Sequence, residues 1–413
     1  MKKILAAALL GLLMLPQVAD AEGFGVVEWT TEGVAMAGAR MFAEDDPGSV
    51  AYNPASITKI QGEAIKNSYT YMSPTGNYDL FDASGNKIES GQNTKHFAWV
   101  PGSYYVKQMN EKDWFGIGAF PRFAMISQFS RNSKVASNAF YSRLKGLSIT
   151  PVYAHKFDKK WSASVGAEIS YIGLELQRQS YSSTYGMNLG STKTDGHSYA
   201  MGWNAAANYA FDEDNEIGML YRSRITHSMD GHFKMHPITG GTITADAYGA
   251  VTFPDSWAFG FNHKFNKCTR IELNATRTNW GTYDALNITL TNPSMAGVLP
   301  SNVDSDKNYK DGWRYAIGLE HKLSEKYSIM CGFAYDESSI PYDGGDFYVP
   351  TGDRRTYTIG FGYNDGKQTF AMAFGYMDIG GIKFAGHSSD AYAYANTHDN
   401  SCKIFSIGYG RHF

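Results

Sequence analysis

A stripe of apolar side chains that ends in a cation lies in the segment WSASVGAEISYIGLELQRQ. Read as a β-strand, this segment places on one face the side chains of Ile172, Leu174, Leu176 and Arg178. An apolar face closed by a guanidinium suits an elongated apolar molecule with a terminal carboxylate. The alternative is a β-bulge near Gly173, which would turn the three apolar side chains to the opposite face.

A proline stands inside a second strand-like segment, WFGIGAFPRFAMI. Pro121 lacks the N–H group that a sheet ladder uses, and proline within sheets is confined to bulges and edges. Following Gly118 in the same segment, it predicts a local break in strand pairing. The alternative is a proline at the outer end of the strand, where no ladder bond is needed.

The elements that would carry these residues are strands with one large apolar face and one small mixed face. The segments WRYAIGLEHKL, YSIMCGFAYD, TYTIGFGY and FAMAFGY all alternate in this way. A soluble sandwich would show a clearly polar second face, whereas lipid outside and a crowded lumen inside require the observed pattern. Aromatic residues make up 15% of the chain, as expected where rings sit at membrane interfaces.

The connections predict the strand number. Short polar turns at KQMNEKD, FDKK, DEDNE, FNK, LSEK and NDGK alternate with long Gly/Ser/Asn/Asp-rich stretches. The long stretches cover about 73–92, 127–141, 180–195, 237–244, 286–308, 340–350 and 384–400. Six short turns and seven long loops join fourteen strands, an even number as bacterial barrels require. The sequence thus predicts an all-β fold, a fourteen-stranded antiparallel transmembrane β-barrel, and its last strand, KIFSIGYGRHF, ends in an aromatic residue.

The N-terminus indicates export. Lys2 and Lys3 precede the apolar run ILAAALLGLLML, and Ala19-Asp20-Ala21 has the form of a cleavage site. Residues 1–21 are therefore a predicted signal peptide, and a bacterial outer-membrane location follows from export of a barrel. Mean hydropathy is −0.35 and no second run of 18 apolar residues exists, which argues against an α-helical membrane protein.

Charge and cysteine usage exclude other classes. A net charge of −3 gives no reason to expect a nucleic-acid partner. Cys268, Cys331 and Cys402 are odd in number and widely spaced, so no disulfide framework is expected. We predict neither a metal site nor a cofactor.

Residues 22–60 do not alternate and are predicted to form a plug, followed by the barrel over 61–413. The segment EGVAMAGARMF predicts a short helix that ends before AEDDPGS. Side chains already fill the interior of an eight-stranded barrel. Fourteen strands enclose a wider lumen, which needs a plug if it is not to leak. About forty compact residues placed before the first strand therefore suit a hatch inside the lumen.

The stretch DDPGSVAYNPAS has the composition of a linker, yet inside a barrel its polar groups need partners. Asn53 offers both a donor and an acceptor, Pro54 needs no donor partner, and Ala55 permits close packing. Asp45 and Asp46 are expected to bond to backbone amides or to inward arginines. We predict that this stretch fastens the hatch to the wall.

The segment EGFGVVEWTTEGVAMAGARMFAEDDPGSVAYNPASI resembles the N-terminus of the long-chain fatty-acid outer-membrane transporter family, of FadL type. Further resemblance follows in the same order at FAWVPGSYYV, GWNAAANYAFDEDNEIGMLYRSRI, TRTNWGTYDAL and GFAYDESSIPYDGGDFYVPTGDRRTYTIGFGY. Each motif alone is weak, but the ordered set covers nearly the whole mature chain. The resemblance implies a fourteen-stranded barrel with an N-terminal hatch and passive uptake of hydrophobic molecules, chiefly long-chain fatty acids and in some members aromatic hydrocarbons.

Residue roles follow from the same resemblance. Arg178 matches the position of the family's carboxylate-contacting arginine. The second basic contact falls in DSDKNYKDGWRY, where Lys307 and Lys310 compete and a solvated loop lysine is the simpler interpretation of either. A kinked third strand opens the family's barrel sideways to the bilayer, and Gly118 and Pro121 suit such an exit.

Other classes of exported β-barrel fit the sequence less well. An outer-membrane barrel enzyme would need a nucleophile and a base at one rim, and no motif in this sequence places them. An adhesin would not need inward apolar residues, and a porin for polar solutes would want an open charged lumen. The expected partners are a hydrophobic small molecule and outer-membrane lipid, and a monomer is expected.

Overall fold

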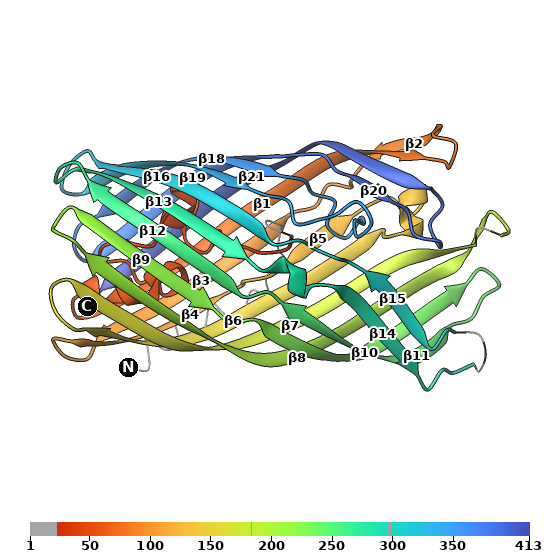
Figure 1. The fold of residues 1–413 in the computed structure, drawn as a ribbon, viewed down its shortest axis with the longest axis horizontal. Coiled ribbons are helices and arrows are strands. Elements are labelled where there is room, and N and C mark those ends of the chain that lie inside the picture. The colour runs from red at the N-terminus through yellow and green to blue at the C-terminus, as the bar shows by residue number, and fades with distance from the viewer. Residues whose placement is uncertain (1–22, 183, 296, 298) are drawn as a thin grey trace.

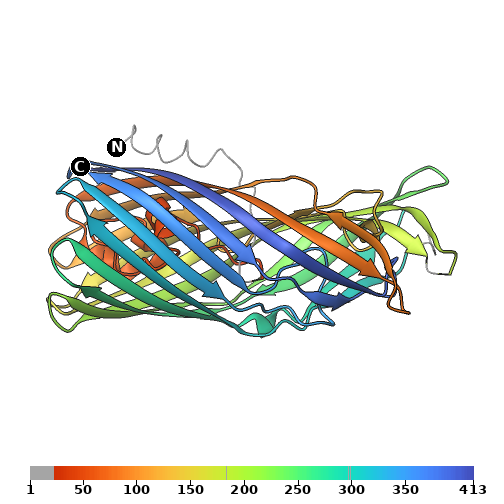
Figure 2. The ribbon, with the colours of Figure 1, turned by 90° about the horizontal axis from the view of Figure 1, so that it is seen from above.

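The strands form a closed barrel in the computed structural model, which describes residues 23–182, 184–295, 297 and 299–413. The barrel is long, and its strands cross the axis obliquely (Figures 1 and 2). Each strand pairs antiparallel with its neighbours, and β1 pairs with β21 from Ala64–His412 to Phe81–Tyr394, which closes the ring. Within the described residues the ring contains fourteen strands, as the alternation of turns predicts.

Nine barrel strands are continuous, and five consist of two segments each. The continuous strands are β1 (Glu63–Phe81), β3 (Ala98–Gln108), β6 (Tyr141–Lys156), β7 (Trp161–Ser182), β8 (Met187–Ala210), β17 (Tyr327–Asp336), β18 (Arg354–Asn364), β19 (Gln368–Ile379) and β21 (Tyr394–His412). The two-part strands are β4 (Asp113–Phe120) with β5 (Met125–Gln128), β9 (Asn215–Arg222) with β10 (Ile225–Pro237), β11 (Ile243–Phe253) with β12 (Ser256–Lys264), β13 (Thr269–Thr278) with β14 (Ala285–Thr291), and β15 (Asn302–Asp306) with β16 (Gly312–Lys322).

Two predicted long loops are wrong, because they are extensions of the strands. The stretch 180–195 is a hairpin of β7 and β8, and 73–92 is the end of β1 with β2 (Lys87–Gln92). The predicted loop at 237–244 is confirmed, because β10 ends at Pro237 and β11 begins at Ile243. β20 (Lys383–Ala385) adds a short strand to β21. Stretches rich in Ser, Thr and Asn have the composition of loops. Their backbone groups nevertheless pair in the sheet ladder beyond the membrane.

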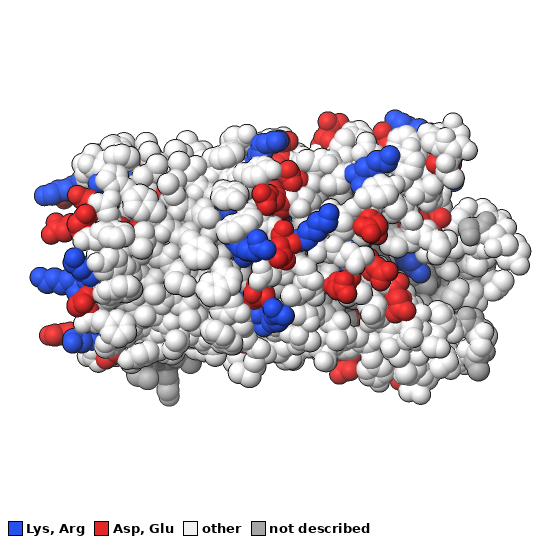
Figure 3. All heavy atoms as spheres, viewed as in Figure 1, with Lys and Arg blue, Asp and Glu red and all other residues white. Residues whose placement is uncertain are grey.

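The outward face carries the large apolar side chains. Tyr315, Ile317, Ile359, Phe374 and Tyr409 are exposed, whereas their small neighbours face the lumen. On the side seen in Figure 3, charged residues gather at the end with the short turns and from the middle of the molecule onward. The zone between them is almost free of charge, as a hydrocarbon layer requires.

The N-terminal segment lies inside the barrel, near the end that holds the C-terminus (Figures 1 and 2). Its helices are α2 (Thr31–Ala35), α3 (Ser49–Tyr52) and the 3₁₀ helix η2 (Pro54–Lys59). The predicted helix is too long, because the chain turns at Ala37 and Gly38, both with positive φ. A Cβ at Gly332 would strike the carbonyl carbon of Met36, so the barrel wall has room for this turn only because residue 332 lacks a side chain.

Two 3₁₀ turns complete the helical content of the described residues: η3 (Lys134–Ser137) before β6 and η4 (Trp280–Thr282) between β13 and β14. No helix in the described ranges is long and apolar enough to cross a membrane. The predicted signal peptide, residues 1–21, lies outside the described residues.

Candidate functional site

An apolar cluster fills the lumen beyond the plug, and we call it the inner apolar cluster. Several barrel strands build it together with the first described residues of the plug. Its buried members are Phe24, Phe123, Met125, Leu144, Ile172, Leu176, Met229, Val251, Phe253, Trp280, Tyr283, Leu286, Tyr309 and Val349. Six of these fourteen residues are aromatic, so rigid rings make up much of the apolar interior of the lumen.

The stripe on β7 lies on the inner side of the wall. Ile172 and Leu176 are buried in the inner apolar cluster and Leu174 packs against it. β7 pairs with β8 without a register shift through Gly173, so the alternative of a bulge there is wrong. The apolar face ends at Arg178, whose Nη1 donates to Ser389 Oγ at 3.2 Å.

The two candidate lysines differ in their surroundings. Lys310 is exposed. Lys307 is only 1% exposed, and its ammonium contacts Asp346 Oδ2 and donates to Ser305 Oγ at 2.9 Å. The interpretation of Lys307 as a solvated loop residue is therefore wrong. It lies 5.2 Å from the centre of the Tyr348 ring, which packs against the inner apolar cluster.

Phe24 occupies the middle of the aromatic residues. Its ring centre lies 4.7 Å from Trp280, 5.1 Å from Tyr283 and 5.7 Å from Phe253, all in edge-to-face geometry. Arg354 Nη2 donates to the carbonyl of Gly23 at 3.2 Å. The plug thus inserts one of its own side chains into the apolar interior.

The third barrel strand is broken at Pro121. β4 pairs with β6 up to Phe120–Ser148, and β5 resumes at Met125–Leu144, so 121–124 stand opposite only 145–147. On the other side, β3 pairs with β4 only from Ser103 onward, and 98–102 have no partner on β4 or β5. The predicted break is present, and it opens a gap in the ladder between β3 and β5.

Gly118 is not part of that break. It pairs regularly with Tyr104 and Thr150, and its missing side chain makes room for Val50 of the plug. The expectation that it contributes to the break is wrong, because the regular ladder extends past Gly118 to Phe120 on the β6 side.

The plug covers the gap from the lumen. Val26 N donates to Arg122 O and Ala124 N donates to Phe24 O, both at 2.8 Å. Trp29 Nε1 donates to Pro121 O at 2.6 Å. The first residues of the plug therefore take up backbone groups that the broken strand leaves unpaired, and they must move before anything passes there.

The stretch from Asp45 to Ser56 is packed and bonded. Asn53 is 0% exposed; its Nδ2 donates to Asn208 Oδ1 at 2.6 Å and its Oδ1 accepts from Ala55 N at 3.1 Å. Pro54 opens η2, and Ala55 is buried. This is the seam between plug and wall.

The two aspartates of the seam differ. Asp46 accepts from Lys66 at 2.8 Å, from Arg40 at 3.4 Å and from Gly48 N at 2.8 Å. Burial opposes ionisation of Asp46, but Lys66 and Arg40 outweigh it and hold the pKa of Asp46 below its usual value. Within the part of the chain that the structure describes, Asp45 bonds to neither an amide nor an arginine; its partner is His412 at 3.4 Å, which corrects the prediction.

Arginines from the wall bind carbonyls of the plug. Arg314 donates to Ala37 O at 2.8 Å and Arg222 donates to Ala51 O at 2.6 Å. Because a guanidinium carries five donors on a rigid fork, it serves irregular backbone that has no ladder partner. Loss of such a donor would leave a buried carbonyl unsatisfied.

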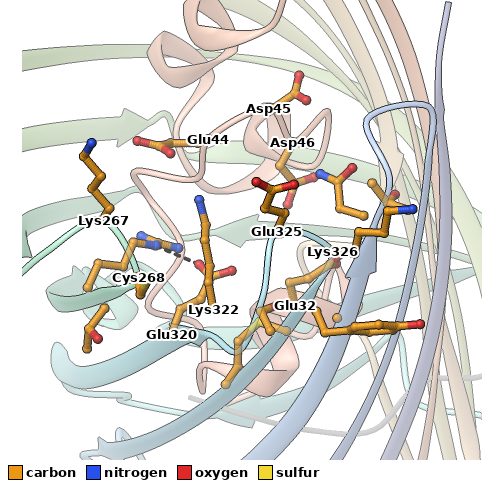
Figure 4. A pocket seen from close by; sticks show the side chains of 18 of the residues that line it. Glu32, Glu44, Asp45, Asp46, Lys267, Cys268, Glu320, Lys322, Glu325 and Lys326 are labelled. Atoms are coloured by element: carbon orange, nitrogen blue, oxygen red, sulfur yellow. Dashed lines mark hydrogen bonds and ion pairs between the residues drawn. The ribbon is translucent and has the colours of Figure 1, made fainter.

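A polar cavity of about 670 Å³ lies beneath the plug at the end with the short turns (Figure 4). Carboxylates and ammonium groups project around it, including Glu32, Asp46, Glu320, Lys322 and Lys326. An apolar molecule that entered this cavity would exchange an apolar lining for charges and water, at about 0.8 kcal/mol for each CH₂ group. A straight path through the plug is thus chemically unsuited to such a molecule.

Several site residues escaped the sequence reasoning. Phe24, Trp280, Asp346 and Tyr348 lie in irregular segments, where period two carries no information. An aromatic residue in a polar loop, as in DGGDFYVP, is the signal that could have pointed to Tyr348.

Barrel, plug and apolar lumen together define an outer-membrane channel with a closed interior. The family model described as outer membrane protein transport protein (OMPP1/FadL/TodX) matches residues 12–413, and the chain belongs to this family. A long-chain fatty acid transport protein of Escherichia coli O6:H1 is 24% identical over 414 residues, covering 90% of each chain. Outer membrane protein P1 of Haemophilus influenzae Rd is 22% identical over 88% of this chain and 87% of its own.

Solved structures share the fold. A FadL homologue of Pseudomonas aeruginosa superposes with a TM-score of 0.84 at 18% identity, covering 94% of this chain and 99% of its own. The toluene transporter TodX of Pseudomonas putida gives 0.71 at 15% identity, covering 95% and 99%. The protein is thus an outer-membrane transport protein, and its relatives include a long-chain fatty acid transport protein and a toluene transporter.

Proposed function

We propose that the protein takes up long-chain amphiphiles with a single carboxylate, such as fatty acids, across the outer membrane. The observation that carries this proposal is the inner face of β7. An apolar stripe from Ile172 to Leu176 ends at Arg178, whose side chain is only partly buried. Among the described residues Arg178 forms no ion pair within 4 Å, so its charge is open to a ligand carboxylate.

The route we propose avoids the polar cavity under the plug. The acyl chain takes the place of the Phe24 ring among Phe253, Trp280 and Tyr283. It then leaves sideways through the gap at 121–124 into the bilayer. Two features support this route: plug residues from Phe24 to Trp29 cover the gap through few hydrogen bonds, and the axial path leads into charged surroundings.

A second candidate substrate class is aromatic hydrocarbons. The rings around Phe24 favour it, since edge-to-face aromatic pairs contribute about 0.5–1.5 kcal/mol each beyond their buried area. Such a ligand would need no cation at the end of the stripe.

Binding of oleate and toluene to wild type and Arg178→Leu, in detergent, tests the proposal. A lost charge-assisted contact of about 1.5–3 kcal/mol predicts roughly 10- to 150-fold weaker oleate binding and unchanged toluene binding. Arg355→Leu, an exposed arginine on the outer surface, is the matched control. Equal oleate affinity in wild type and Arg178→Leu would refute the role of Arg178, and absent oleate binding by wild type would refute the proposed function.

A further inference from the structure

Lys307 is a buried cation whose anion position is already filled. Its ammonium is held by Asp346 Oδ2 and Ser305 Oγ, and the side chains of Lys307 and Asp346 are 1% and 2% exposed. A charged lysine that is buried from water strongly destabilises the fold unless a counter-ion stays beside it. A ligand carboxylate therefore cannot bind Lys307 while Asp346 remains in place.

Asp346 is held in position by its own loop. Its Oδ1 accepts from Tyr348 N at 2.8 Å and from Val349 N at 3.3 Å, so one oxygen orders the turn and the other contacts the lysine. The loop packs tightly here, since a Cβ at Gly344 would strike the carbonyl of Lys307. The carboxylate thus ties the loop over 340–349 to the segment that precedes β16.

This ion pair borders the space that the proposed function gives to the ligand. Tyr348 lies over Lys307 and packs against the inner apolar cluster. Burial raises the pKa of Tyr348 to about 12, and the nearby charge of Arg178 opposes this rise. Tyr348 is thus a neighbour of both cations, and its ring stands between the end of the stripe and the ion pair in the proposed path of the carboxylate.

We propose that Asp346 is an internal competitor for the ligand carboxylate. The inference rests on the proposed function. A ligand first meets Arg178, and its carboxylate then exchanges with Asp346 on Lys307. One anion replaces another, so the buried charge stays balanced, and the loop over 340–349 is released from the wall. Asp346 thereby decides how strongly the site prefers a carboxylate over a neutral headgroup.

Asp346→Asn separates the two duties of this side chain. The amide oxygen can still accept from Tyr348 N and Val349 N, but Lys307 loses its counter-ion. A ligand carboxylate then supplies the missing charge without competition. We expect the affinity for oleate relative to methyl oleate to rise about tenfold or more, because coupling between close buried charges is strong.

Dissociation constants of oleate and methyl oleate should be measured for wild type, Asp346→Asn and Lys307→Met/Asp346→Asn. The double variant should lose the gain, since the cation that the ligand would use is gone. The inference would be overturned if the ratio of the two dissociation constants were unchanged in Asp346→Asn, or if the gain persisted in the double variant. In either case, oleate binding by wild type would leave the proposed function standing. Absent oleate binding by wild type would instead overturn the proposed function.

A measurement on the wild-type chain does not depend on the folding of any variant. Hydrogen exchange in 340–349 should rise when oleate is added, because Asp346 is displaced from Lys307 and its loop is released. Methyl oleate carries no charge and should leave the exchange of this loop unaltered. Equal effects of the two ligands, or no effect of oleate, would overturn the exchange of anions.

Discussion

Replacing Asn53 by alanine should loosen the plug while the barrel stays intact. Asn53 is fully buried and makes two hydrogen bonds, one across the seam to Asn208 and one to Ala55 N at the start of η2. Alanine leaves Asn208 Oδ1 without this donor, at about 1–3 kcal/mol for an unsatisfied buried group. It also removes the cap of η2, at about 1 kcal/mol.

Together these losses weaken plug docking by about 2–4 kcal/mol, which is roughly a 30- to 700-fold shift toward the undocked state. Single-channel recordings in planar bilayers should show a proportional rise in the fraction of time spent open to ions. Asn208→Ala should act in the same direction, and the double variant should be less than additive, because each single change strands the other amide.

Asn132→Ala, at an exposed position outside the lumen, is the matched control and should leave conductance unchanged. Barrel integrity is checked by the heat-dependent shift in gel mobility. An open fraction equal to that of wild type, in an intact Asn53→Ala barrel, would show that the seam does not hold the plug.

Two further predictions concern the exit and the outer loops. Deleting Pro121 leaves three residues opposite 145–147, so the ladder from β4 to β5 should become continuous. Oleate uptake by whole cells should then fall at least tenfold, which corresponds to about 1.4 kcal/mol. Uptake at the wild-type rate by this variant would contradict a lateral exit. The hydrogen bond to Asp390 raises the pKa of His387 above 6.5. The protonated His387 therefore stabilises the folded loop below about pH 6.5, and this stabilisation is lost as the pH rises through the raised pKa. After correction for intrinsic rates, 386–392 should exchange more slowly at about pH 5.5 than at about pH 8.5, and His387→Gln should abolish the difference; a difference that persists in His387→Gln would assign it to another group.

The barrel could be predicted because its causes are local. Alternation over seven to ten residues, as in TYTIGFGY, reports which side chains meet lipid, and tight turns are short enough to be recognised one at a time. The same local reasoning failed for the hairpin at 180–195. Its polar strands rise beyond the membrane, where neither face needs to be apolar and alternation disappears.

The site was predictable only where it lies on a regular strand. Ile172 to Arg178 could be placed by counting along β7, and Pro121 by its missing N–H group. The ring partners of Phe24 are Phe253, Trp280 and Tyr283, which come together only when the barrel has closed. The burial of Lys307 depends on Asp346, 39 residues further along, and no spacing rule connects them.

The plug has two halves that are held by different forces, so ion leakage and ligand uptake should be separable. The half nearest the gap is held by a backbone hydrogen bond from Val26 and by aromatic packing of Phe24, and an apolar ligand can replace that packing. The seam is held by Asn53 and by the ion pairs of Asp46, which such a ligand cannot replace. Asn53→Ala should therefore raise ion leakage while the initial rate of oleate uptake stays within about twofold of wild type. A parallel loss of uptake would mean that the plug moves as one rigid body.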